Sequence, residues 1–429
     1  MKEETLIRIR KRNMKLYPAY KTLSWDYIFF YTINFLFLTQ VKGINPADVV
    51  LIDSFYYLFA VFCQIPATFI IEFLGRKNSI ILGNILGCLY MVMIIFSNNL
   101  FNLIIAEILS ALSFAIKESA EPSLLNESIP PYSQKDRIFA KISSKGLSMY
   151  YVLNAISMIL SGILYEVNPY IPIILSLSAL ILVTILSLFF IEPIERRNRK
   201  RLDPFKQIKD LSIAFKFVLK SERLKSLLLF SSIMMGLFSI LSNYEVSLLE
   251  DLNVSAKFLG VVSAALGIVS AVSARNQEKF HCKFTNKSLS ILGGIAAIAC
   301  IASGLFGIVT EDFPICIFII LLFFIIRHFI KGIYYPLMEK YLGNFTNEEI
   351  DTKIYTAESF FKSISCAIFG IFASFLLDRM DTALCLIIIG SIFGFIIILV
   401  SSFMKKRLGL KPSEYPKEDI KYDNIKIPQ

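Results

Sequence analysis

The fold is decided around Gln64-Ile-Pro-Ala-Thr-Phe-Ile-Ile-Glu-Phe-Leu-Gly-Arg-Lys77, the end of one apolar stretch and a short basic link to the next. Its last six residues have the pattern Glu72-x-x-Gly75-Arg76-Lys77. Glycine permits a tight backbone connection, and cytoplasmic loops of membrane proteins are enriched in lysine and arginine. The stretch therefore predicts a cytoplasmic hairpin between two membrane helices.

The composition agrees with a membrane location. The 429 residues are 55% hydrophobic and 18% charged, with a mean hydropathy of +0.62, which is too apolar for ordinary soluble domains. A formal net charge of +10 would suggest nucleic acid as a partner of a soluble protein. In a membrane protein, positive charge sets the topology instead. We therefore predict a polytopic membrane protein with lipids around it and no nucleic-acid partner.

The same sequence argues against metal, cofactor and enzyme chemistry. The seven cysteines are scattered without the paired spacing of a zinc site or disulfide framework, and there are only two histidines. No Gly-x-x-x-x-Gly-Lys phosphate loop occurs, and no connection is long enough for a nucleotide-binding domain. We therefore expect no metal, no cofactor and no enzymatic activity, and we expect a monomer.

Twelve apolar stretches have a length suited to crossing a bilayer, for which about 20 residues are needed. Basic residues gather in the connections after even-numbered stretches, whereas acidic residues predominate after odd-numbered ones. This alternation places both termini in the cytoplasm, and the Ile-, Lys- and Asn-rich composition suggests a bacterial cell membrane. The expected spans are 22–41, 48–71, 79–97, 100–120, 138–165, 168–191, 226–247, 255–274, 288–309, 313–338, 354–377 and 382–404.

These spans predict an all-α protein made of two six-helix bundles. A weak internal repeat supports two halves, since Lys117-x-x-x-x-Pro122 recurs as Lys331-x-x-x-x-Pro336 at an offset of 214. Apolar residues at helical spacing between Phe205 and Leu219 predict an amphipathic helix on the inner leaflet. The expected parts are a cytoplasmic arm (1–21), a first bundle (22–191), a central loop (192–225), a second bundle (226–404) and a cytoplasmic tail (405–429).

The architecture and the hairpin together resemble the major facilitator superfamily, whose 2–3 loop reads Gly-x-x-x-Asp-Arg-x-Gly-Arg-Lys/Arg. Here the Gly-Arg-Lys end is kept, while Thr68, Glu72 and Phe73 replace the first glycine, the aspartate and the first arginine. The resemblance implies secondary transport by alternating access, with a central cavity lined chiefly by helices 1, 4, 7 and 10. It also implies that Glu72 meets the N-terminal end of helix 11, near Ile354 to Thr356.

The resemblance makes the hairpin a conformational gate, formed by Glu72, Gly75, Arg76 and Lys77. Two departures from the family argue against antiport. The basic residue that the family often carries in helix 4 has no match in the first half of span 4, and span 5 lacks the Gly-Pro signature of drug/proton antiporters.

Candidate site residues are the ionisable side chains inside the spans, because each is costly there unless it is paired, hydrated or functional. We assign to substrate binding or coupling Asp26 in span 1, Lys117, Glu118 and Glu121 in or just past span 4, Glu245 in span 7, and Arg327, His328 and Lys331 in span 10. Two alternatives stay open. The residues near the cytoplasmic ends could snorkel or belong to the gate, and any of the charges could form internal salt bridges. Glu358 and Lys362 are expected to be structural.

The function predicted from these residues is secondary active transport of a small molecule, driven by an ion gradient and most simply by protons. Glu118 and Glu121 are the first candidates for the coupling carboxylate, followed by Asp26 and Glu245. Arg327 and Lys331 share a helix face and need counterions, so an anionic or zwitterionic solute is expected, with Glu118 or Glu121 as the internal alternative. Efflux of lipophilic compounds and a non-transporting membrane sensor are the competing interpretations.

Overall fold

The computed structural model describes residues 3–130, 135–193, 221–310, 315–344 and 351–408, together with six positions of the central segment (209, 212, 215, 216, 218 and 219). Helices make up most of these ranges, and turns or short links join them. Most of the amphipathic helix predicted between Phe205 and Leu219 lies outside the described residues. All-helical structure is the expected solution in a bilayer, because a helix satisfies its own backbone hydrogen bonds.

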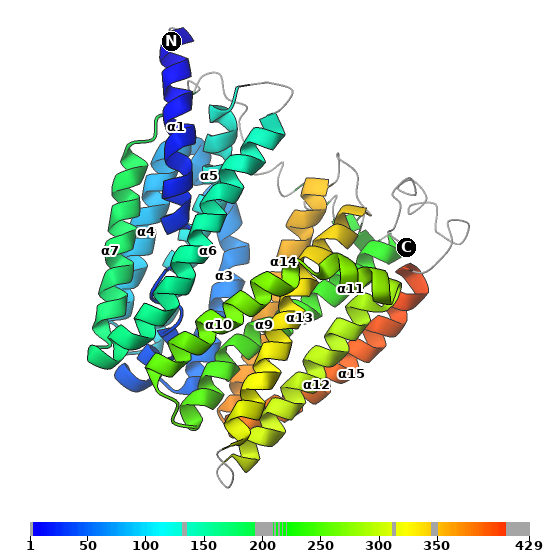
Figure 1. Cartoon of the computed structure of the whole chain (residues 1–429). Helices are drawn as coiled ribbons and strands as arrows, with labels where there is room; N and C mark the ends of the chain where they lie inside the picture. Colours follow the sequence, from blue (N-terminus) through cyan, green and yellow to red (C-terminus); the bar gives the residue numbers. More distant parts are fainter. Residues whose placement is uncertain are drawn as a thin grey trace. The chain divides into compact units, whose positions relative to one another are not determined.

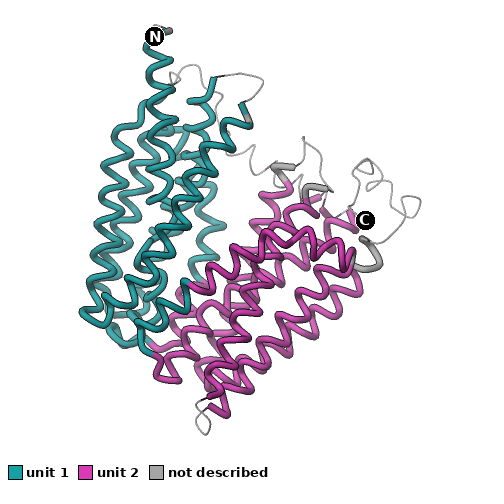
Figure 2. The backbone as a smooth tube through the Cα atoms, in the orientation of Figure 1, with its two compact units in different colours: residues 1–44, 55–206, 255–264 teal, residues 45–54, 207–254, 265–429 magenta. Residues whose placement is uncertain are grey.

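Two compact units make up the chain, coloured separately in Figure 2. The first comprises residues 1–44, 55–206 and 255–264. Its elements are α1 (Glu3–Ser24), α2 (Asn34–Leu36), a π-helix (Phe37–Val41), most of α3 (Pro46–Leu74), α4 (Arg76–Phe96), α5 (Leu100–Ser128), α6 (Lys135–Val167), α7 (Tyr170–Leu188) and the start of α10 (Ala256–Ala274). Figure 1 labels the longer helices.

The second unit comprises residues 45–54, 207–254 and 265–429. It contains the start of α3, the remainder of α10, α9 (Glu222–Asp251), α11 (Gln277–Phe284), a 3₁₀ turn (Thr285–Lys287), α12 (Ser288–Val309), α13 (Cys316–Asn344), α14 (Asp351–Leu377) and α15 (Thr382–Leu408). The helices α3 and α10 therefore each contribute residues to both units.

Eleven helices in the described ranges are long and apolar enough to cross a membrane. They correspond to spans 2 to 12 of the sequence prediction. Figure 1 shows them as long helices, and the chain is accordingly a multi-pass membrane protein.

The expected first span, 22–41, is not one helix, and this part of the prediction is wrong. The helix α1 ends at Ser24, residues 25–33 form turns, and helical structure resumes only at Asn34. Hydropathy missed the break because residues 25–33 contain neither proline nor glycine. Phe29 has a φ of +70°, an unusual conformation for a bulky residue.

Side chains compensate for the backbone hydrogen bonds lost in this break. The Lys117 ammonium donates to the carbonyl of Ser24 at 3.3 Å, and the Ser161 hydroxyl donates to the carbonyl of Phe29 at 2.8 Å. The Asp26 carboxylate accepts from the backbone N–H of Tyr27 at 2.9 Å. Irregular backbone at membrane depth is tolerated where protein groups satisfy it or where it lines a cavity.

Glycines allow close helix contacts within each unit. In the first unit, a Cβ added to Gly162 of α6 would overlap the carbonyl of Ala256 at the start of α10. In the second unit, a Cβ on Gly332 of α13 would overlap Ser270 and Ser273 of α10. Small residues commonly permit such close packing between membrane helices.

Candidate functional site

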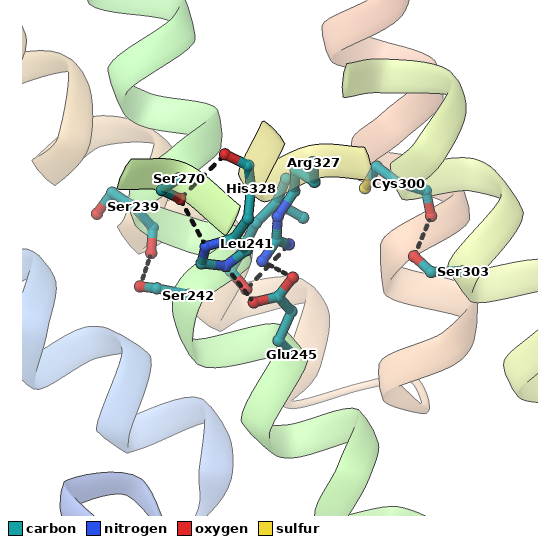
Figure 3. Close-up of polar contacts among 9 residues, drawn as sticks. All are labelled: Ser239, Leu241, Ser242, Glu245, Ser270, Cys300, Ser303, Arg327 and His328. Carbon is teal, nitrogen blue, oxygen red and sulfur yellow. Dashed lines mark hydrogen bonds and ion pairs between the residues drawn. The ribbon is translucent and has the colours of Figure 1, made fainter. Parts of the chain in front are cut away.

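The second unit holds a buried cluster of charges on facing helices, shown in Figure 3. Glu245 of α9 and Arg327 of α13 are each only 6% exposed, and they form an ion pair through the arginine Nη2 and the carboxylate Oε1. Arg327 also donates from Nη1 to the carbonyl of Leu241 at 3.3 Å, one turn before Glu245. A buried charge requires such compensation.

His328 extends this cluster on the other side of the carboxylate. Its Nε2 lies 3.3 Å from Oε2 of Glu245, and its Nδ1 lies 3.3 Å from the hydroxyl of Ser270 on α10. Ser270 also contacts the backbone carbonyl of His328 at 3.0 Å, as a donor. Figure 3 shows the imidazole between Ser270 and Glu245. We call Glu245, Ser270, Arg327 and His328 the Glu245 cluster.

The close packing of α10 on α13 makes the histidine contacts possible. Gly332 follows His328 by one helical turn, and its lack of a side chain lets Ser270 approach α13. A carboxylate, an imidazole and a hydroxyl then lie in one hydrogen-bonded row. Because imidazole and hydroxyl groups both donate and accept, this row can hold an added proton in more than one place.

Lys331 lies on α13 one turn beyond Arg327. Its side chain is partly buried and has no ion-pair or hydrogen-bond partner among the described residues. This distinguishes it from Lys362 of α14, which pairs with Glu358 at 2.6 Å, as expected of a structural pair. Glu358 also accepts from the hydroxyl of Ser231 at 2.8 Å.

The first unit has a second buried carboxylate with different partners. Glu121 of α5 is fully buried and pairs with Lys21 of α1, with 2.5 Å between Nζ and Oε2. Its other oxygen accepts from the hydroxyl of Tyr20 at 2.8 Å. Tyr20 in turn accepts from the Asn84 amide at 3.2 Å.

Within the described residues, the structure shows which partners these charges take. Glu121 is paired with Lys21, whereas Lys117, four residues before it, lies over the ring of Phe114 at 4.3 Å and caps α1. Arg327 takes its counterion from Glu245. Helical spacing alone could not choose between these partners, because it says nothing about which side chains neighbouring helices supply.

A cavity of about 230 Å³ lies in the first unit beside the break in span 1. Its charged lining residues are Lys21, Asp26, Lys117 and Glu118. Asp26 accepts from the hydroxyl of Tyr150 at 3.1 Å as well as from its own neighbouring backbone. Three of the candidate site residues, Asp26, Lys117 and Glu118, are thus brought together around one cavity.

Aromatic rings complete the lining. They come from Trp25 and Tyr31 in the break, Tyr56 of α3 and Phe114 of α5. Sequence reasoning missed these rings, because a tryptophan or tyrosine near the end of an apolar span ordinarily marks the membrane interface. The one available signal was that Trp25, the only tryptophan of the chain, directly precedes an in-span acid.

The hairpin residues occupy the link between α3 and α4. Gly75 has a φ of +85°, a conformation that any side chain would strain. Arg76 is 5% exposed. Its Nη1 lies 3.8 Å from Oε1 of Glu72, and its Nε lies 3.3 Å from Oε1 of Glu127 on α5. The backbone N–H of Lys77 donates to Glu192 at 3.0 Å. The expected meeting of Glu72 with helix 11 stays a prediction.

The long apolar helices and the buried in-span charges define the chain as a multi-pass membrane protein. The sequence model of the major facilitator superfamily matches residues 22–349. The chain therefore belongs to the major facilitator superfamily.

Solved structures show the same fold at low sequence identity. The nucleoside transporter NupG matches with a TM-score of 0.68 and 11% identity, covering 94% of this chain and 100% of that one. A bacterial homolog of the human lysosomal transporter Spinster matches with a TM-score of 0.66 and 14% identity, covering 97% of this chain and 98% of that one. A POT family transporter in complex with 5-aminolevulinic acid gives 0.64 and 12%, covering 94% and 96%. No curated protein sequence matches the chain.

Proposed function

We propose that this protein is a secondary active transporter that couples the movement of a small charged solute to protons by alternating access. The observation that carries the proposal is the Glu245 cluster, in which one buried carboxylate is shared by Arg327 and His328. Glu245 thus becomes the leading coupling group, ahead of Glu118 and Glu121, because its partners include a group that can take up a proton.

The mechanism follows from what a proton would do in this cluster. An added proton on Glu245 removes the negative charge that balances Arg327, and a buried unbalanced arginine is costly. The cost is relieved if the guanidinium finds a new anion or water, which requires α9 and α13 to move. Loss of the proton restores the original pair. Proton binding and helix movement are then linked, as coupled transport requires.

The solute in this proposal carries a negative charge. Lys331 lacks a counterion among the described residues and lies on α13 one turn from Arg327. An ammonium at this depth is stabilised by an anionic group. Because Arg327 is already paired with Glu245, Lys331 becomes the first candidate to bind a solute carboxylate or phosphate. Arg327 would join it once Glu245 is protonated.

The proposed location is the cell membrane with both termini in the cytoplasm, as the loop charges predict. Single cysteines at Asn98 or Asp312, in a background without other cysteines, should react with an impermeant thiol reagent added outside intact cells. A cysteine at Asn198 should stay unlabelled. Labelling at Asn198 would contradict the topology and with it the sidedness of the proposed transport. Asp312 and Asn198 lie outside the described residues.

The coupling proposal is tested in proteoliposomes that enclose a pH-sensitive dye. Solutes are added from a panel of peptides and 5-aminolevulinic acid, which carry a carboxylate and appear in the names of structural neighbours, with nucleosides as uncharged solutes for comparison. We expect a transported solute to drive proton movement, and Glu245→Gln to abolish it while leaving exchange of labelled solute. The matched control is Glu358→Gln, also a buried carboxylate paired with a cation. Proton movement that survives Glu245→Gln would refute the assignment.

A further inference from the structure

The cavity beside the break in span 1 has more negative than positive charge to balance. Lys21 is already paired with Glu121 at 2.5 Å. The ionisable groups that remain on the lining are Lys117, Asp26 and Glu118, one cation and two acids. Among the described residues Glu118 has no ion-pair or hydrogen-bond partner, and its side chain is exposed.

The backbone adds to this negative character. The helix α1 ends at Ser24 on the cavity lining, and the last carbonyls of a helix carry partial negative charge. Lys117 satisfies one of these carbonyls. The cavity therefore favours a further cation, because the end of α1, Asp26 and Glu118 all contribute negative charge. Glu118 is the group left to serve as its counterion.

The aromatic lining selects the kind of cation. Trp25 and Tyr31 are 41% and 48% exposed, and with Tyr56 and Phe114 they line the same cavity. The Trp25 ring already has the Lys21 ammonium 4.6 Å from its centre. Aromatic faces attract organic ammonium groups, and they also stack on flat rings. A hydrated metal ion would gain little binding energy from these aromatic rings.

We propose that this cavity binds a solute bearing a protonated amino group on a flat or aromatic body, with Glu118 as the counterion of the amine. This inference deepens the proposed function. It rests on that proposal only in treating the ligand of the cavity as the transported solute. A solute that carries both an amino group and an acidic group satisfies this inference and the negative charge proposed above.

The single tryptophan provides a direct readout of binding, because Trp25 lines the cavity and no other tryptophan contributes to the emission. Tyramine, tyrosine, 4-hydroxyphenylacetate and p-cresol are titrated into the purified full-length chain, with excitation where phenols do not absorb. Tyramine and tyrosine share the amino group, whereas the other two lack it. We expect saturable changes in Trp25 emission with the two amines and markedly weaker responses with the acid and with p-cresol.

A charge-neutral variant isolates the counterion. Glu118→Gln should weaken amine binding by about tenfold or more, the equivalent of one lost charge-assisted interaction. Glu107→Gln is the matched control, since Glu107 is on the same helix but hydrogen-bonds to Tyr90 at 3.1 Å away from the cavity lining. Equal affinity for p-cresol and tyramine, or unchanged amine binding in Glu118→Gln, would overturn the inference.

The two proposals fail separately. Binding to Trp25 needs no gradient, so a saturable, Glu118-dependent amine signal without proton movement supports this site and refutes coupled transport. Proton-coupled transport of a solute that gives no Glu118-dependent signal supports the proposed function and refutes this site. Absence of any emission change with the amines at concentrations that saturate transport also refutes it.

Discussion

The two buried carboxylates of this protein, Glu245 and Glu121, have partners of different kinds. Glu245 lies between an arginine and a histidine on a neighbouring continuous helix, and all three come from regular backbone. Glu121 is held by a lysine and a tyrosine that immediately precede a break in span 1. The first arrangement can take up a proton between facing helices, whereas the second anchors the end of α1 beside a cavity.

The cations that pair with the two carboxylates also differ in their exposure to solvent. Arg327 has 7% of its side chain exposed, while Lys21 has 15%. A lysine can keep its ammonium near water by extending its chain, but a guanidinium at this depth depends on protein partners. The contrast suggests that the Glu245 cluster responds to protonation and that the Glu121 pair contributes mainly to folding. The following predictions test that division.

The largest expected effect follows removal of the charge of Glu245. Glu245→Gln leaves Arg327 buried without a counterion, which should cost about 3–5 kcal/mol of stability. The double variant Glu245→Gln/Arg327→Gln should recover most of that loss, because no unbalanced charge is left. Thermal unfolding of the purified variants in one detergent measures both changes. Equal stability of Glu245→Gln and the natural chain would show that water or lipid already compensates Arg327.

Much of this molecule follows from hydropathy and charge. Spans 2 to 12 appear as long apolar helices, because a run of about 20 apolar residues has one stable form in a bilayer. Arg327, His328 and Glu245 could be singled out because buried charges stand out in apolar sequence. Their mutual pairing could not, since it depends on how α9, α10 and α13 pack around Gly332.

The break in span 1 was beyond sequence reasoning for a related reason. Apart from Asp26 and Thr32, residues 25–33 are apolar or aromatic, so their hydropathy is that of a continuous span. The break is stabilised by Lys117 and Ser161, which are distant in sequence. Proline and glycine are the usual signals of an interrupted helix, and this segment has neither. Only the packing of α5 and α6 against the segment reveals that an irregular backbone can be satisfied there.

A smaller loss is expected at the other carboxylate. Glu121→Gln keeps a hydrogen-bond partner for Tyr20 and leaves Lys21 able to reach water, so the cost should be about 1–2 kcal/mol. When both variants are unfolded under the same conditions, the two losses of stability can be compared directly. A loss as large as that of Glu245→Gln would show that Lys21 is no better hydrated than Arg327, and the proposed division would fail.

The two lysines among the candidate site residues, Lys117 and Lys331, have no carboxylate partner within 4 Å among the described residues, and they extend the comparison. Lys117 caps the end of α1, so Lys117→Met should destabilise the protein by about 1–3 kcal/mol through the unsatisfied Ser24 carbonyl. Lys331 has no such bond among the described residues, so Lys331→Met should change stability by less than about 0.5 kcal/mol and should weaken solute binding instead. Unfolding temperature and solute uptake together separate the two outcomes. Normal uptake by Lys331→Met would refute its role in binding an anion.

The most selective effect on coupling is expected from His328→Gln. The glutamine amide can replace one hydrogen bond, to Glu245 or to Ser270, but it cannot take up a proton. Solute exchange without a gradient should therefore stay near its natural rate, while the dependence of transport on pH should flatten, because the proton can no longer be shared with an imidazole. The matched control is the other histidine of the chain, His281, which is buried near Ser288 and Tyr341 on the second unit. His281→Gln should leave the pH profile unchanged. If both variants shift the profile equally, the shift reflects a general loss of packing, and the row from Ser270 through His328 to Glu245 is not the proton path.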